Sequence, residues 1–166
     1  MIDAGKTKGI LLIFSLAILF TIVGSIKENE YQITTDEHDQ RWPAIYKDIV
    51  VWQDNRNGNW DIYGFNLSTQ KEFQITTNTA DQLYPAIYGD IVVWIDERFG
   101  RKDLFWYDLS TEIESKIPTE SEAFGDPAIC ENIVVWSGST EHGHQIHGYD
   151  LSAGQEFQID TGSHVQ

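Results

Sequence analysis

The chain has little cysteine and little basic charge. Cys130 is the single cysteine among 166 residues, so no disulfide can form within the chain. Only 11 lysines and arginines stand against 26 aspartates and glutamates, which gives a formal net charge of -15 at pH 7. Because Arg101 and Lys102 are the only adjacent basic residues, no basic stripe is available for nucleic-acid phosphates or anionic membranes. We expect no nucleic-acid partner and interpret the acidity as a solvated surface.

The sequence also lacks the signatures of common enzymes. It contains no G-x-S-x-G elbow, no H-E-x-x-H pair, no phosphate-binding loop and no cysteine and histidine at a useful spacing. Carboxylates are abundant, but those that recur at a fixed spacing are better explained as turn residues. These absences predict a protein that is not an enzyme and that carries no cofactor.

Long apolar runs are absent except near the N-terminus. There, Lys6 and Lys8 precede the uncharged run GILLIFSLAILFTIVGSI at residues 9–26. Such a run is typical of an export signal, and small residues precede a predicted cleavage point after Ser25. The same run would also just span a bilayer as an uncleaved helical anchor. We expect residues 1–25 to be a signal peptide or signal anchor and the rest to be extracytoplasmic: periplasmic, secreted or on the cell surface.

A unit of 42 residues recurs three times after this segment, without insertions. Its most visible part is the apolar run Ile-Val-Val-Trp, which ends at Trp52, Trp94 and Trp136. A Pro-Ala-Ile triplet precedes each run, and a Leu-Ser pair follows it, in constant register. Fixed spacing of this kind is typical of a repeat architecture.

Each unit predicts four short strands separated by turn residues. In the first unit we expect them around 43–46, 49–53, 61–67 and 73–77. About 42 residues with four antiparallel strands are typical of one blade of a β-propeller. The apolar run would then pack against neighbouring blades on both faces, which explains why polar and apolar residues do not alternate in it. The three repeated tryptophans are predicted to form the blade core.

We therefore predict an all-β fold, a partial β-propeller within residues 26–166. Its three four-stranded antiparallel blades are expected at about 42–77, 84–119 and 126–161. Residues 31–35 are expected to add an extra fourth-position (D) strand, after the N-terminal hydrophobic helix.

The second unit, ITTNTADQLYPAIYGDIVVWIDERFGRKDLFWYDLST, resembles the repeat of TolB-like propellers, also described as WD40-like PD40 repeats. The resemblance extends over residues 30–166, and the residues that carry it are Pro85, Ala86, Asp96, Arg98, Gly100 and Asp103. One departure is the turn between the first two strands, where the family usually has S-P-D-G and this unit has Y-G-D. The I-V-V-W version is most similar to repeats of exported archaeal and bacterial cell-surface proteins. The resemblance implies a propeller fold and leaves the role open among scaffolds, surface proteins and accessory domains of peptidases.

Three predicted blades are fewer than the roughly four to eight that close a propeller. Three explanations stay open. The chain is a truncated piece of a longer propeller, which includes the case of a gene remnant without independent activity. Alternatively, two copies join into a six-bladed ring, or the chain is an open-ended monomer with exposed apolar faces.

The hairpin between the second and third strands carries the best polar constellation. Two aspartates and an arginine recur there in the first two units and are replaced together in the third, which indicates that they interact. We expect the guanidinium to bridge both carboxylates and to fix the hairpin. A calcium site built from the hairpin's aspartates and asparagines is the alternative, although its spacing does not match and an arginine lies among the ligands. The predicted residues are Asp54, Arg56, Asp61, Asp96, Arg98 and Asp103.

Other polar and aromatic residues are weaker candidates. His142 and His144 could share one face of a strand and hold Zn²⁺ or Cu²⁺, but a solvated cluster is the alternative. Asn66 begins an N-x-Ser sequon and is a candidate glycosylation site on an exported chain. Unrepeated tryptophans could stack on sugars or anchor a partner, or could fill irregular packing. They are Trp42, Trp60 and Trp106.

From these patterns we predict a non-enzymatic, exported propeller that acts as a protein-interaction or cell-surface scaffold. Its expected partners are a protein or further propeller blades, including a second copy of the chain, and it would contact a membrane only through an uncleaved N-terminal segment. The alternative function is an accessory or catalytic propeller domain of a system that degrades polysaccharide or peptide.

Overall fold

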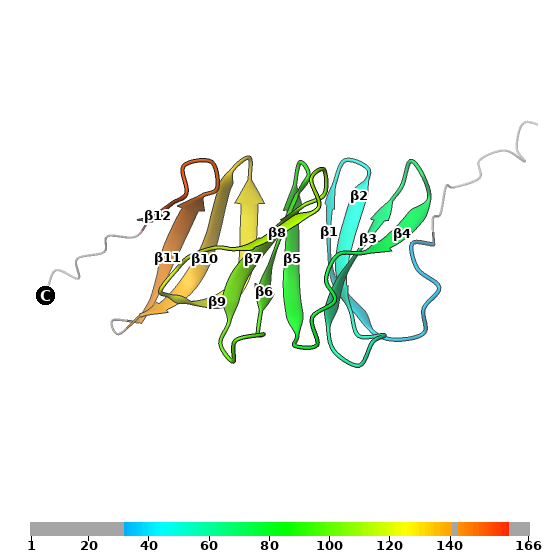
Figure 1. Cartoon of the computed structure of the whole chain (residues 1–166), viewed down its shortest axis with the longest axis horizontal. Coiled ribbons are helices and arrows are strands. Elements are labelled where there is room, and N and C mark those ends of the chain that lie inside the picture. Colours follow the sequence, from blue (N-terminus) through cyan, green and yellow to red (C-terminus); the bar gives the residue numbers. More distant parts are fainter. Residues whose placement is uncertain (1–31, 141–142, 160–166) are drawn as a thin grey trace, which may run out of the picture. The chain divides into compact units, whose positions relative to one another are not determined.

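A computed structural model of the chain describes residues 32–140 and 143–159 (Figure 1). Apart from Gln32, these residues belong to a compact unit that begins at Ile33. The leader or anchor predicted at residues 9–26 lies outside the described residues. Within the described ranges, no helix has the length and apolar character needed to cross a membrane.

The described residues form twelve β-strands and no helix, which confirms the predicted all-β class. The strands make three antiparallel sheets of four, and in each sheet the spatial order equals the chain order. The first sheet contains β1 (Gln40–Tyr46), β2 (Ile49–Asp54), β3 (Asp61–Asn66) and β4 (Lys71–Gln74). The second contains β5 (Gln82–Tyr88), β6 (Ile91–Asp96), β7 (Asp103–Asp108) and β8 (Ile113–Lys116). The third contains β9 (Glu122–Cys130), β10 (Ile133–Thr140), β11 (Gly143–Asp150) and β12 (Gln155–Gln158).

The fourth strand of each sheet differs from the prediction. In the first sheet the strand was expected at 73–77, but β4 begins at Lys71 and ends at Gln74. The two residues after it bond to β3 outside the strand ladder. The backbone N–H groups of Ile75 and Thr76 both donate to the Ile62 carbonyl, at 2.8 and 3.2 Å, so they close the end of the sheet. Residues 32–35, the described part of the predicted extra strand, form no strand. Ile33 packs on the outer face of the first sheet, against the cluster that contains Val50 and Trp52.

The hairpins between the first two strands of each sheet share one backbone conformation. Each is a two-residue turn whose first residue has positive φ: 49° at Lys47, 61° at Gly89 and 55° at Glu131. Positive φ at this position matches the turn to the twist of the flanking strands. The three units thus use the same turn geometry with different side chains.

The apolar run is buried where sheets stack. In β6, Val92 and Trp94 pack toward the first sheet, whereas Val93 and Ile95 pack toward the third. These four side chains are at most 1% exposed. Burying each contributes roughly 1.5–3 kcal/mol, so the central strand is a main source of cohesion between sheets. This confirms the explanation for the apolar run of β6, the strand that has a sheet on either side.

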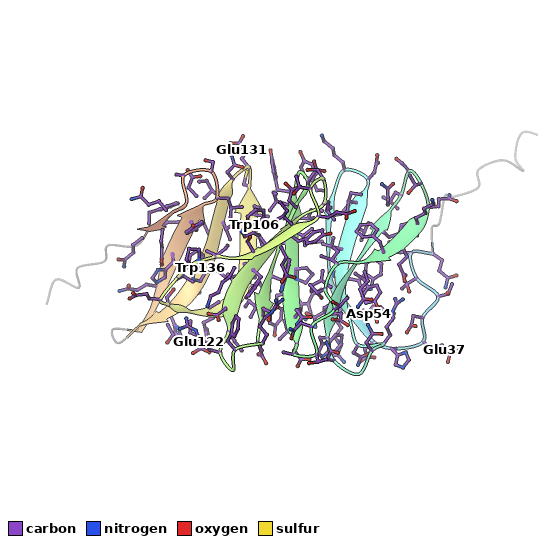
Figure 2. The ribbon with its side chains drawn as sticks, in the orientation of Figure 1. Glu37, Asp54, Trp106, Glu122, Glu131 and Trp136 are labelled. Atoms are coloured by element: carbon purple, nitrogen blue, oxygen red, sulfur yellow. The ribbon has the colours of Figure 1, made fainter. Side chains whose placement is uncertain are left out.

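Glycines at one position of the third strand make room for phenylalanines. Gly64 is paired with Phe73, and a Cβ on Gly64 would meet that ring at 2.5 Å; Gly148 and Phe157 repeat the arrangement. In the second sheet the large and small residues change places, because Trp106 stands at the glycine position and Ser115 stands at the phenylalanine position opposite it. The unrepeated Trp106, labelled in Figure 2, therefore fills space that phenylalanine fills in the other sheets.

Candidate functional site

The hairpin of the first sheet holds a charged cluster around Arg56. Asp54, labelled in Figure 2, lies at the end of β2 and is completely buried. It binds the guanidinium through both oxygens, with Nε–Oδ1 3.0 Å and Nη2–Oδ2 2.7 Å. The same guanidinium pairs with Glu72 on β4 and lies 4.1 Å from the ring centre of Tyr63. The indole Nε1–H of Trp52 donates to Asp54 at 3.0 Å. The arginine thus links three strands of one sheet.

Protonation equilibria in this cluster follow its contacts. Burial alone would raise the pKa of Asp54, but the hydrogen bonds from Arg56 and Trp52 outweigh burial and hold that pKa below its ordinary value. The hydrogen bond with Asp54 raises the pKa of Arg56 further. The pair is therefore ionised at neutral pH, and it neutralises itself inside the protein.

The second sheet repeats the cluster with the same geometry. Arg98 binds Asp96 at 2.9 and 2.7 Å, pairs with Glu114 at 2.7 Å and lies 4.2 Å from the ring centre of Phe105. Asp96 is completely buried and accepts a hydrogen bond from Trp94 at 3.0 Å. Two sheets therefore hold a guanidinium between an aromatic face and a buried carboxylate.

The second aspartate of each hairpin has partners other than the bridging arginine. Asp61 accepts hydrogen bonds from Asn57 at 2.8 Å and from Gln74 at 3.2 Å. Asp103 pairs with Arg101 at 2.9 Å and with Lys116 at 2.8 Å. The expectation that one guanidinium bridges both hairpin aspartates was wrong, because a glutamate on the fourth strand lies across the arginine instead. Those glutamates, together with Glu156, recur every 42 residues, which is the sequence signal that could have identified them.

The third sheet fills the same place without an arginine. His147 occupies the aromatic position, stacks on Trp136 with ring centres 5.6 Å apart and contacts Glu156 through Nδ1 at 2.9 Å. Gly138 stands where the other sheets have the buried aspartate, and a Cβ there would lie 2.6 Å from the His147 ring. The Trp136 indole, without an aspartate, donates to Ser121 at 3.3 Å. An imidazole ring against a glycine replaces the arginine–aspartate pair.

The described residues offer no metal centre. His142 lies outside the described residues, and His144 is exposed and stacks on Phe124 with ring centres 4.4 Å apart. Among residues 32–140 and 143–159, no group of three or more histidine, cysteine, aspartate or glutamate side chains is placed to hold a metal ion. In the first hairpin, both carboxylate oxygens of Asp54, a ligand in the calcium alternative, bind the Arg56 guanidinium.

The remaining predicted residues are distributed over the molecule. Trp52, Trp94 and Trp136 are 3%, 0% and 2% exposed and belong to the three apolar clusters. Trp60 is half-buried, with the Arg41 guanidinium 5.3 Å from its ring centre. Asn66 ends β3 and accepts a hydrogen bond from the Thr69 N–H at 2.9 Å.

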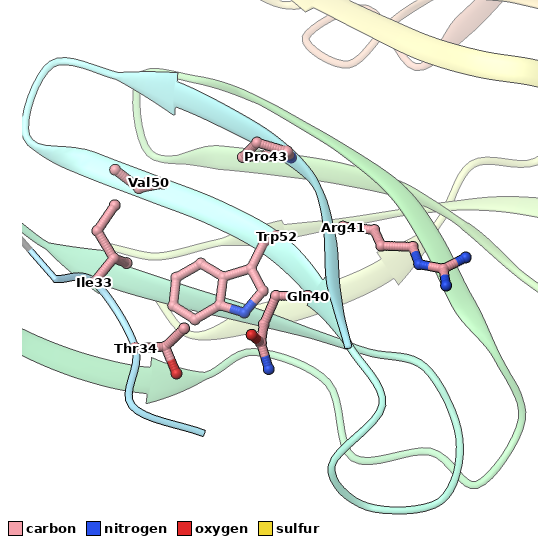
Figure 3. A pocket seen from close by; sticks show the side chains of 7 residues that line it. All are labelled: Ile33, Thr34, Gln40, Arg41, Pro43, Val50 and Trp52. Atoms are coloured by element: carbon pink, nitrogen blue, oxygen red, sulfur yellow. The ribbon is translucent and has the colours of Figure 1, made fainter. Parts of the chain in front are cut away.

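The outer face of the first sheet has a small apolar pocket of about 160 Å³ (Figure 3). Figure 3 shows the ring of Trp52 with Ile33 and Thr34 on one side and Gln40 on the other. Val50 and Trp52 are nevertheless only 6% and 3% exposed. This end of the described stack is therefore largely covered.

The outer face of the third sheet is open. Phe124 and Ile146 lie on either side of Ser137 in neighbouring strands, so they share one face, and Phe157 rests over Gly148 on that face. Their exposed fractions are 54% for Phe124, 42% for Ile146 and 39% for Phe157. In the second sheet, Leu104 takes the repeat position of Ile146 and is fully buried. One sheet thus presents to solvent a face that its neighbour buries.

The described fold is similar to solved TolB and enzyme propellers. TolB from Acinetobacter baumannii matches with TM-score 0.66 and 17% identity over 82% of this chain and 36% of that one. A putative TolB from Agrobacterium tumefaciens matches with TM-score 0.65 and 13% identity over 77% and 51%. A puromycin-hydrolysing peptidase from Mycobacterium tuberculosis matches with TM-score 0.61 and 15% identity over 74% and 20%.

These similarities establish a TolB-like propeller fold, as the repeat predicted. Because the sequence identities are low, the similarities show the fold and not the function. The chain spans about a third to a half of the length of the two TolB structures. Neither a protein-family model nor a curated protein sequence matches the chain. Because proteins named TolB and a hydrolytic enzyme share the fold, function has to be argued from the surfaces of this chain.

Proposed function

We propose that this chain, a partial propeller of TolB-like fold, is a non-enzymatic scaffold that binds protein through the open face of its third sheet. The observation that carries the proposal is the exposure of Phe124, Ile146 and Phe157 on one side of a sheet. Soluble monomers rarely expose contiguous apolar patches of large side chains, and such patches mark interaction sites. The scaffold is proposed to act outside the cytoplasm, in line with the predicted leader at residues 9–26.

The covered interfaces in the chain indicate what fits the open face. Between the second and third sheets, Val93 and Leu104 on one side pack against Val134 and Trp136 on the other. The first sheet carries the equivalent residues Val50 and Trp52 on its outer face, and Ile33 packs there. A blade that presents such a face uncovered, from a further propeller segment or from a second copy in which Ile33 is displaced, would therefore complement the open third sheet.

Solution mass tests this proposal. The full chain should associate, and Ile146→Asp should shift it to a smaller species in light scattering, because a carboxylate would be buried in the interface. Phe99→Asp is the matched control, since Phe99 is 65% exposed but lies on a hairpin loop of the second sheet. A wild-type chain that stays monomeric and soluble at high concentration, with no change in the Ile146 variant, would contradict it.

The enzyme alternative rests on the likeness to the puromycin-hydrolysing peptidase, of which the chain spans 20%. In that reading the chain is an accessory propeller of a system that degrades peptide or polysaccharide. Hydrolysis of a peptide or polysaccharide panel by the purified full chain would favour this alternative over the scaffold. A third reading, a gene remnant, would be favoured if the chain expressed in its own host cannot be obtained folded.

Export and processing have their own test. Intact-mass measurement on chain recovered from cell fractions should place it outside the cytoplasm, either cleaved after Ser25 or retaining residues 1–25 as an anchor. The same spectrum reports a glycan on Asn66 as added hexose mass. Recovery only from the cytoplasm, with an intact N-terminus, would contradict the extracytoplasmic location.

A further inference from the structure

One repeat position brings three unlike side chains into a single pocket. Trp42, Tyr84 and Asp126 each directly precede the repeated proline, 42 residues apart in the sequence. They lie on the first strands of the three sheets, β1, β5 and β9, which are neighbours in the fold (Figure 1). Together with Pro43 and Pro85 they line a pocket of about 250 Å³.

The backbone holds the two aromatic residues in an unusual conformation. Trp42 and Tyr84 both have φ of 56°, in the left-handed region that bulky residues rarely adopt. Each lies where the register between the first two strands shifts, and the Tyr84 N–H donates to the Gln53 side chain of the neighbouring sheet at 2.9 Å. The two rings meet edge to face, 5.1 Å apart, and Trp42 is 50% exposed. The bulge accounts for the backbone conformation but not for the exposure of the Trp42 ring, whereas a binding surface accounts for that exposure.

Elsewhere in this protein, an aromatic ring and a carboxylate together bind an arginine guanidinium. Arg56 lies between Tyr63 and Asp54, and Arg98 repeats this arrangement in the second sheet. The pocket also combines aromatic rings with a carboxylate, but it has two rings and its carboxylate, Asp126, is exposed. No lysine or arginine of the described residues pairs with Asp126, and the nearby Arg41 is engaged with Trp60 and Asp39.

We infer that this pocket binds the guanidinium of an arginine side chain presented by a protein partner. The rings of Trp42 and Tyr84 would contact the cation and its apolar stem, and Asp126 would accept its hydrogen bonds. The net charge of -15 favours the approach of a basic segment. The inference rests on the proposed scaffold role and specifies an arginine as the partner residue that is bound. The pocket lies on the first strands of the three sheets, apart from the open face of the third sheet.

A pair of peptides tests the site on the full chain. Calorimetric titration with acetyl-Gly-Arg-Gly-amide should show binding, whereas the same peptide with citrulline, which has similar shape and no charge, should not bind. Trp42→Asn should weaken binding of the arginine peptide about fivefold, and Asp126→Asn about threefold. Asparagine is chosen at position 42 because it tolerates positive φ, so the variant should fold as well as the wild type. Trp42→Phe, which keeps a ring, should retain most of the binding.

Matched controls separate this site from the rest of the surface. Phe99→Asn and Glu120→Gln remove an exposed ring and an exposed carboxylate elsewhere and should leave binding unchanged. Equal binding of the two peptides, or wild-type binding by both Trp42→Asn and Asp126→Asn, would overturn the inference. Ile146→Asp should change the solution mass without changing peptide binding. The arginine-pocket inference and the proposed docking face can therefore be confirmed or contradicted independently.

Discussion

The second and third sheets have the same strands in the same order, yet they differ in burial and in charge. The second sheet is covered on both faces and holds Arg98 between Asp96 and Glu114. The third sheet leaves one face open and replaces the charged pair by His147 against Gly138. The difference shows that the 42-residue repeat specifies strand order, while stacking decides which sheet faces are buried and single side chains decide which polar contacts close each hairpin.

The largest expected effect compares one repeat position in two sheets. Leu104→Ala should lower the free energy of unfolding by about 2–5 kcal/mol, because Leu104 is fully buried between sheets. In dilute, unassociated chain, Ile146→Ala at the equivalent position should cost less than about 1 kcal/mol, because Ile146 is 42% exposed. Urea unfolding followed by tryptophan fluorescence measures both. Equal losses would mean that the third-sheet face is covered in solution.

The next effect concerns the charged clusters. Arg98→Met leaves the fully buried Asp96 without its cation and should cost about 3 kcal/mol. Glu156→Gln in the third sheet keeps a hydrogen-bond acceptor for His147 and should cost less than about 1 kcal/mol. Chemical unfolding at neutral pH checks both variants. A small loss for Arg98→Met would show that the cluster contributes little to stability.

A smaller effect tests the exchange of volume between strands. Gly148→Ala should cost about 1–3 kcal/mol, because the new Cβ would meet the Phe157 ring at 2.5 Å. Adding Phe157→Ser, which reproduces the small residue found opposite Trp106 in the second sheet, should recover much of that loss. Thermal unfolding of the single and double variants measures the recovery. Additive losses would contradict the direct packing of the two positions.

The smallest expected effect is a dependence on pH. The pKa of Asp54 is held below its ordinary value of 3.8 in the folded protein, so its stabilising effect is complete above that pH and is lost as the pH falls below it. Asp54→Asn should therefore flatten the stability profile below about pH 4. The equivalent position in the third sheet is Gly138, which has no carboxylate to titrate. Unfolding curves from pH 5 to pH 2.5 check the slope, and an unchanged slope in Asp54→Asn would refute the assignment.

Much of the fold could be read from the sequence because the repeat is regular. The spacing of Trp52, Trp94 and Trp136 predicted three stacked units, and the unbroken apolar run predicted burial on both faces, as found for β6. The ends of the fourth strands were misplaced, because Ile75 and Thr76 look like strand residues but close the sheet by bonding to Ile62. Local pattern does not distinguish a paired residue from one that packs just beyond the ladder.

The candidate sites could be read only in part. Joint replacement of the hairpin residues indicated that Asp54 and Arg56 interact, and they do. The second partner was missed, because Glu72 lies 16 residues from the arginine and reaches it only through strand pairing. The pocket of Trp42, Tyr84 and Asp126 was also beyond the sequence, since its members are 42 residues apart and meet only where sheets stack.

The sequence by itself determined a three-fold repeat of four strands and a core of tryptophans, because hydrophobic periodicity and turn residues act over short distances along the chain. Only the tertiary structure decided which carboxylate completes each arginine, which aromatic residues share a pocket with Asp126 and which sheet face stays exposed. Those outcomes depend on contacts between strands far apart in the sequence, and such contacts are set by how the sheets stack.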